Sequence, residues 1–180
     1  MRHLALTLLT AVFFISAPAS AQDVPADAPP DTTEGPRPRY LAAIETELEA
    51  LSIPHSCEAV SEIRAHCAFP YRGRSTEREF DVHLVYSDDT DTIYFYVARL
   101  ATALPDASTT PALLRRLMEL NWSLLVAKLE WNAADGEVRL SMIQNTDSNF
   151  DRRAFRGLVR RIGSLADRYA RELDRLSSAD

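Results

Sequence analysis

Apolar and polar residues alternate along five short stretches in the middle of the chain, with the period of two that is typical of β-strands. The stretches are residues 63–69, 79–86, 93–97, 127–131 and 138–142. An acidic turn at 87–91 separates the second stretch from the third. A loop at 133–136, which ends in Asp-Gly, separates the last two. Each of these pairs therefore predicts a β-hairpin.

Charged side chains on the second hairpin select its register. With Trp131 opposite Val138, Glu130 faces Arg139 across the two strands. Sliding the pairing by two residues would instead oppose Glu130 and Glu137, and like charges directly opposite each other are unfavourable. We therefore expect the first register.

Apolar residues recur at helical spacing in three other stretches, at 40–51, 110–120 and 151–176. Thr110 and Pro111 supply an N-cap and a first-turn proline for the second helix. The order of helix, three strands, helix, two strands, helix predicts an α+β fold. We expect a single two-layer domain, in which three helices cover one face of an antiparallel sheet of about five strands.

The beginning of the chain indicates export. A basic start, an apolar run and the small residues Ala19, Ser20 and Ala21 predict a signal peptide over 1–21, cleaved after Ala21. A retained anchor is the alternative, but the run is short for a bilayer, which needs about 20 residues. Residues 22–39 are rich in proline and predict a disordered spacer. The domain is expected over 40–176, in a periplasm or secreted, without a stable membrane anchor.

The charge of the chain limits its partners. It carries 20 basic and 26 acidic residues, a net charge of −6, and loss of Arg2 with the signal peptide would leave −7. An acidic chain is a poor candidate for general nucleic-acid binding. The sequence holds five glycines and no glycine-rich phosphate loop, and we expect no cofactor.

Cys57 and Cys67 are the two cysteines of the chain. In an oxidising compartment such a pair most often forms a disulfide, and a hairpin that turns near Glu62 would bring the two together. A zinc site that adds His55 and His66 is the alternative. The zinc site is disfavoured because His66 and Cys67 are adjacent in a predicted strand, so their side chains point to opposite faces.

No catalytic pattern accompanies the three histidines of the mature chain, His55, His66 and His83. The acidic turn at 87–91 could suggest calcium, but it lacks the distant glutamate of the common calcium loop. A solvated turn explains it better, so no catalytic or metal site is predicted.

The last helix begins with an unusual charge distribution. Asp151 is a good N-cap, and Phe150 and Phe155 are spaced as a hydrophobic staple. Five arginines precede the next acidic residue: Arg152, Arg153, Arg156, Arg160 and Arg161. They oppose the helix dipole, at a cost of roughly a few tenths of a kcal/mol each. Three explanations remain open. The arginines could form a solvated face, could pair with Glu45, Glu47 and Glu49 of the first helix, or could bind an acidic partner (a peptide, another subunit or anionic lipid).

A second candidate surface lies on the predicted sheet. Tyr94 and Tyr96 point to the face opposite Ile93, Phe95 and Val97, with His83 on the neighbouring strand. In a two-layer domain that face carries no helices, so the tyrosines could contact a peptide or a second copy of the chain. Ordinary cross-strand stabilisation is the alternative explanation.

Residues 113–169 resemble a YbjN-type domain, whose fold is similar to that of type III secretion chaperones. The likeness rests on four features: Leu120-Asn121 at a helix end, 127–129, the turn and strand at 135–140, and the final segment 166–169. It implies a non-enzymatic sensory transduction regulator that, like secretion chaperones, binds a peptide and forms a dimer. The predicted signal peptide departs from the cytosolic setting of secretion chaperones, which puts effector delivery in doubt.

Two classes of function follow from the sequence. The first is an exported, non-enzymatic module that binds a protein or peptide, a second copy of the chain included. The alternative is a small periplasmic enzyme or ligand-binding protein with its site in a cleft. Titratable residues that converge in a pocket would favour the alternative, whereas an exposed apolar sheet face would favour the binding module.

Overall fold

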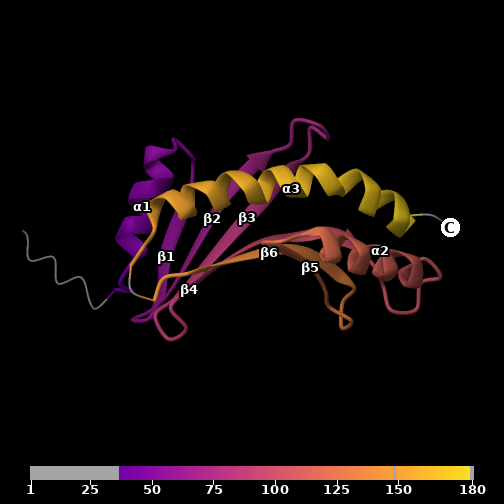
Figure 1. Ribbon diagram of the computed structural model, residues 1–180, viewed down its shortest axis with the longest axis horizontal. Coiled ribbons are helices and arrows are strands. Elements are labelled where there is room, and N and C mark those ends of the chain that lie inside the picture. The colour runs from indigo at the N-terminus through magenta and orange to yellow at the C-terminus, as the bar shows by residue number, and fades with distance from the viewer. Residues whose placement is uncertain (1–36, 148, 179–180) are drawn as a thin grey trace, which may run out of the picture. The chain divides into compact units, whose positions relative to one another are not determined.

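A computed structural model describes residues 37–147 and 149–178 of the chain (Figure 1). The predicted signal peptide and nearly all of the predicted spacer lie outside the described residues. The elements in chain order are α1 (Leu41–Ala50), β1 (Ser56–Ser61), β2 (Arg64–Arg72), β3 (Glu79–Ser87), β4 (Thr92–Thr102), α2 (Thr110–Ser123), β5 (Ala127–Trp131), β6 (Glu137–Asn145) and α3 (Arg152–Ser178).

The sheet is antiparallel and has six strands in the order β1-β2-β3-β4-β6-β5. The α+β class with three helices is confirmed, and the sheet has six strands where about five were expected. The strand that alternation did not indicate is β1, which only the expected hairpin near Glu62 implied. Five of the six side chains of its sequence SCEAVS are exposed, so no buried face imposes an apolar alternation. Such an edge strand is held by its neighbour rather than by a buried face, so the pattern does not report it.

All three helices pack on one face of the sheet. Alternate strand residues contribute to a single core with the apolar sides of α1, α2 and α3, and the largest fully buried side chains include Tyr86, Phe95 and Phe155. Helix α3 runs along the sheet over β3, β4 and β6 (Figure 1). No helix of the described residues covers the other face of the sheet, and we call it the open face.

The β5–β6 hairpin has the predicted register. Trp131 pairs with Val138 and Glu130 with Arg139. The two charged side chains nevertheless bond elsewhere: Arg139 reaches Glu137 on its own strand at 2.9 Å, and Glu130 accepts hydrogen bonds from other residues of the open face. Charge selected the correct register, although no direct ion pair forms between the two.

The helix ends agree with the capping pattern at α3 and differ by one residue at α2. The Asp151 side chain accepts the N–H of Ala154 at 2.9 Å, and the Phe150 and Phe155 rings lie 5.2 Å apart as a staple. Helix α2 begins at Thr110, with Thr109 in the cap position. The Thr110 hydroxyl donates to the carbonyl of Leu104 at 2.6 Å and is therefore not a helix cap.

The segment between β2 and β3 is fastened to α3 by one buried carboxylate. Asp167 accepts the N–H of Ser75 and both the N–H and the hydroxyl of Thr76, at 2.7–2.9 Å. A Cβ on Gly73 would lie 2.2 Å from Asp167, so only glycine allows this approach. Burial disfavours the charge of Asp167, but these hydrogen bonds prevail and lower its pKa to about 2.

Candidate functional site

A row of rings crosses the middle of the open face. It consists of His66 on β2, His83 on β3, and Tyr96 and Tyr94 on β4, and we call it the aromatic row. Ring centroids in successive pairs are 5.4, 4.8 and 5.4 Å apart, with interplanar angles of 18–30°. Strand pairing produces the row, because His83 lies directly opposite Tyr96 in the β3–β4 register.

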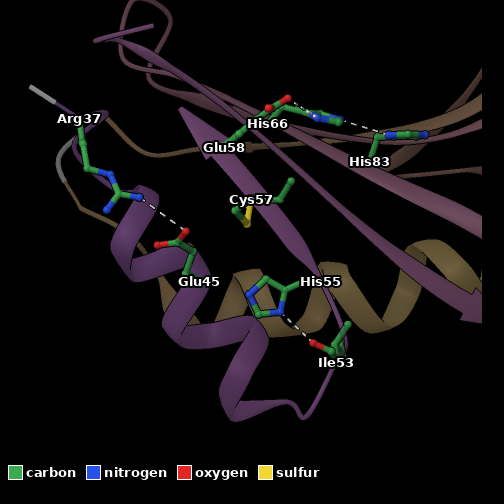
Figure 2. The surroundings of a disulfide bond; sticks show 9 residues. Arg37, Glu45, Ile53, His55, Cys57, Glu58, His66 and His83 are labelled. Atoms are coloured by element: carbon green, nitrogen blue, oxygen red, sulfur yellow. Dashed lines mark hydrogen bonds and ion pairs between the residues drawn. A yellow bond between two sulfur atoms is a disulfide. The ribbon is translucent and has the colours of Figure 1, made fainter. Parts of the chain in front are cut away.

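Polar groups fix the two ends of the aromatic row. His66 Nε2 lies 3.2 Å from His83 Nδ1, and the other nitrogen of His66 lies 3.8 Å from Glu58 on β1 (Figure 2). At the far end, Tyr94 donates to Glu130 at 2.6 Å, while the Arg139 guanidinium lies 5.2 Å from the Tyr96 ring centroid. The rings are thus held in place before any partner arrives, which lowers the entropy cost of binding.

The electrostatics of the row favour an uncharged His83 and an uncharged Tyr94. Partial burial, which disfavours the charged imidazole, and the neighbouring His66 lower the pKa of His83. Partial burial and the bond to Glu130 raise the pKa of the Tyr94 hydroxyl. The row thus presents aromatic surface between charged residues, a composition typical of protein-binding sites.

Cys57 and Cys67 form a disulfide between paired positions of β1 and β2, with their Cα atoms 4.1 Å apart (Figure 2). The histidines of the zinc alternative have other contacts: His55 Nδ1 lies 2.8 Å from the carbonyl oxygen of Ile53, and His66 meets His83. Across residues 37–147 and 149–178, no group of three or more His, Cys, Asp or Glu is arranged to hold a metal ion.

The acidic turn before β4 is occupied by an arginine of the chain itself. Arg39 lies 3.5 Å from both Asp88 and Asp91 and donates its backbone N–H to Asp88 at 3.1 Å. The buried Tyr86 also donates its hydroxyl to Asp88. The turn thus secures the residues that precede α1, so ordered contacts begin before the predicted start of the domain at Tyr40.

The structure divides the five arginines of α3 into two groups. Arg152 and Arg156 both bind Glu47 of α1, a fully buried carboxylate, with Arg152 at 3.1 Å. The bond from Arg156 is the main reason why the pKa of Glu47 is lowered despite burial. These two arginines therefore serve the α1–α3 contact, as the pairing alternative allowed. Their charge reversal would disturb folding before it reported on a partner.

The remaining three arginines are exposed and have no carboxylate within 4.0 Å among the described residues. Arg153 and Arg160 border a shallow depression along α3. Arg161 faces another depression, which it shares with Arg168 and the segment that joins α2 to β5.

An exposed apolar cluster at this junction was missed by sequence reasoning. It comprises Met118 and Trp122 on α2, and Leu125 and Val126 before β5, and we call it the corner cluster. The available signal was helical spacing: Met118 and Trp122 are four residues apart, on the face of α2 opposite Leu113, Leu117 and Leu120. Ile143, also exposed, links the cluster to the open face through a shared depression.

A further depression lies at the end of β3 and gives the cleft alternative its best location. Glu79, Asp81 and His83 border it together with Arg78 and Arg99. Arg78 is engaged with Asp174 at 3.2 Å and with the carbonyl of Arg99 at 3.0 Å. Glu79 and Asp81 are both exposed. Titratable groups are present, but no nucleophile–base pair is assembled among them.

Comparisons with known proteins agree with this fold. The sequence model of one family, described as "YbjN: Putative bacterial sensory transduction regulator", matches residues 41–175. A solved structure described as "YbjN, a putative transcription regulator from E. coli" superposes with a TM-score of 0.52 at 16% identity, covering 73% of this chain and 89% of that one. No curated protein matches the chain. No helix among the described residues is long and apolar enough to cross a membrane.

Proposed function

Because this chain belongs to the YbjN family, whose description is that of a sensory transduction regulator, we propose that it is an exported, non-enzymatic module that binds a protein or peptide. The aromatic row carries the proposal. Four rings stand in line on a sheet face without helices, and hydrogen bonds position those at both ends. Surfaces of this kind bind partners through rigid aromatic anchors.

The open face suits an extended or helical peptide better than a small molecule. The rings and their polar neighbours are spread over β1 to β6 rather than gathered around one point. A small-molecule site needs convergent polar groups in a concavity, whereas a peptide is read along a surface. The aromatic row with its charged ends fits a segment whose apolar residues are flanked by charged ones.

Export is the second part of the proposal. The basic start, apolar run and small residues of 1–21 support it, as does the pairing of Cys57 with Cys67, which an oxidising compartment maintains. Cell fractionation followed by mass spectrometry of the purified protein is the test. A periplasmic or secreted protein that begins at Gln22 is expected, whereas a cytosolic protein that retains Met1 would contradict export.

The binding proposal is tested with a photoreactive benzophenone side chain in place of Tyr96, crosslinked in living cells and analysed by mass spectrometry. We expect a defined covalent adduct, which Tyr94→Ser weakens by removing the adjacent ring. The matched control carries the same group at Arg153, an exposed position on the helix side of the domain. Equal adducts from both positions, or none from position 96, would refute the open face as the binding surface.

A further inference from the structure

The corner cluster contains the two most exposed large apolar side chains of the described residues. Leu125 is 94% exposed and Trp122 is 93% exposed, and Met118 and Val126 stand beside them. The cluster lies on the last turns of α2 and on the short segment that joins α2 to β5. Adjacent apolar side chains that are so fully hydrated indicate a surface that becomes covered in function.

Cations surround the corner cluster. Arg161 and Arg168 of α3 border the same depression as Leu125 and Val126, and Lys128 borders the adjoining one. None of these three cations has a carboxylate partner among the described residues. The nearby acids are engaged. Arg116 holds Glu119 at 2.9 Å and Glu172 at 2.6 Å, and Glu130, which borders the depression of Lys128, accepts hydrogen bonds from Tyr94 and Ser141. The corner is therefore locally basic on a chain whose net charge is −6.

From this arrangement we infer that the corner docks on the surface of an anionic lipid bilayer. Trp122 and Leu125 enter the boundary between headgroups and acyl chains, where tryptophan is favoured, and Arg161, Arg168 and Lys128 meet lipid phosphates. A bilayer can accommodate projecting apolar side chains at any position of its surface. A protein partner, in contrast, must provide a complementary pocket for each of them. The near-complete exposure of both residues favours the bilayer on this ground.

The inference is independent of the proposed function, because the corner cluster shares no residue with the aromatic row. Docking by the corner would hold the domain at a membrane while the open face binds its partner. A failure of either proposal can therefore be distinguished from a failure of the other: Tyr96→Ser should leave docking unchanged, and corner variants should leave the benzophenone adduct unchanged.

The test uses the chain from Gln22 onward, which keeps every described residue and removes the apolar run at the start. Sedimentation with vesicles of phosphatidylcholine containing one-quarter phosphatidylglycerol is compared with sedimentation with phosphatidylcholine alone. We expect preferential binding to the anionic vesicles. The chain has two tryptophans, so Trp131→Phe leaves Trp122 as the reporter, and its emission should move to shorter wavelength on binding.

Variants separate the apolar and charged parts of the site. Trp122→Ser with Leu125→Ser should weaken vesicle binding at least about tenfold, because two large side chains lose their burial. Arg161→Gln with Arg168→Gln should remove most of the preference for phosphatidylglycerol, about tenfold or more. Val60→Ser with Ile63→Ser, at the exposed apolar pair of the opposite edge, is the matched control and should bind normally.

Three results would overturn the inference. The first is no binding to anionic vesicles by a protein that circular dichroism shows to be folded. The second is binding that the Trp122 and Leu125 variant retains, which would indicate adsorption by charge alone. The third is self-association in solution, or capture of the open-face partner, that depends on Trp122. That result would identify the corner as a protein interface.

Discussion

The two edge strands of the sheet are secured by different means. Strand β1 is joined to β2 by the Cys57–Cys67 disulfide. Strand β5 lies beside α2, whose Asn121 side chain accepts the N–H of Leu129 at 2.8 Å and donates to its carbonyl at 2.9 Å. The indole of Trp131 adds a bond to the carbonyl of Ala103 at 2.9 Å.

The contrast follows from what each strand buries. Strand β5 places Ala127 and Leu129 in the core, whereas five of the six β1 side chains are exposed. An edge strand without buried side chains gains little hydrophobic free energy from packing on the core. In β1 the disulfide supplies the stabilisation that such packing would otherwise give. A strand with a buried face needs only to have its free backbone groups covered.

Removal of a core side chain from β5 should have the largest effect. Leu129→Ala is expected to lower the free energy of unfolding by about 3 kcal/mol, because a buried side chain is lost and a cavity remains. Val60→Ala on β1, at a side chain that is 62% exposed, is the control and should change stability by less than about 0.5 kcal/mol. Urea denaturation of both variants measures the difference, and similar losses would contradict the contrast.

Loss of the disulfide should come next. Cys57→Ser with Cys67→Ser is expected to cost about 2–3 kcal/mol on a chain-entropy basis, because the closed loop is short. The effect should be strongest in β1, because Cys57 is its one side chain packed against the core, while Cys67 of β2 is itself buried in the core. Amide hydrogen exchange is expected to accelerate in β1 and to stay unchanged in β5 and β6. Global acceleration across all six strands would show that the disulfide supports the whole domain.

Acid should release the attachment of the β2–β3 segment to α3. The folded-state pKa of Asp167 is about 2, below its ordinary value of 3.8, so its contribution is complete above about pH 4 and is lost as pH falls through 2. The shift corresponds to about 2 kcal/mol. Denaturation between pH 2 and 5 should show this loss in the wild type and a much flatter profile in Asp167→Asn. Parallel profiles would exclude Asp167 as the anchor.

Much of the fold could be predicted from local pattern. Alternation located five strands, charge selected the β5–β6 register, and capping residues located the start of α3. Alternation did not indicate strand β1, because its exposed sequence has no apolar period. The two hydrogen bonds between the Asn121 side chain and the backbone of Leu129 were not predicted for another reason. They depend on the end of α2 lying beside Leu129, eight residues away, which no local pattern specifies.

The candidate binding surfaces were predictable only in part. Tyr94 and Tyr96 were identified because strand alternation assigns faces, but the continuation of the row to His66 depends on the pairing of β2 with β3. The arginines of α3 were grouped by their spacing alone. Their division requires knowing that Glu47 is buried against Arg152 and Arg156, a contact across more than 100 residues of sequence. Tertiary proximity, rather than composition, decided which of these charges remain free.

The smallest expected effect concerns the cover of the β5 edge. Asn121→Ala should cost about 1 kcal/mol, because the N–H and carbonyl of Leu129 exchange their side-chain partner for water at an accessible edge. Asn121→Asp keeps the acceptor for the N–H and loses the donor, so its stability should fall between the wild type and the alanine variant.

Uncovering the strand also exposes backbone groups that can pair with another chain. Analytical ultracentrifugation should therefore detect more self-association in Asn121→Ala than in Cys57→Ser with Cys67→Ser, and the reverse order would place the vulnerable edge at β1.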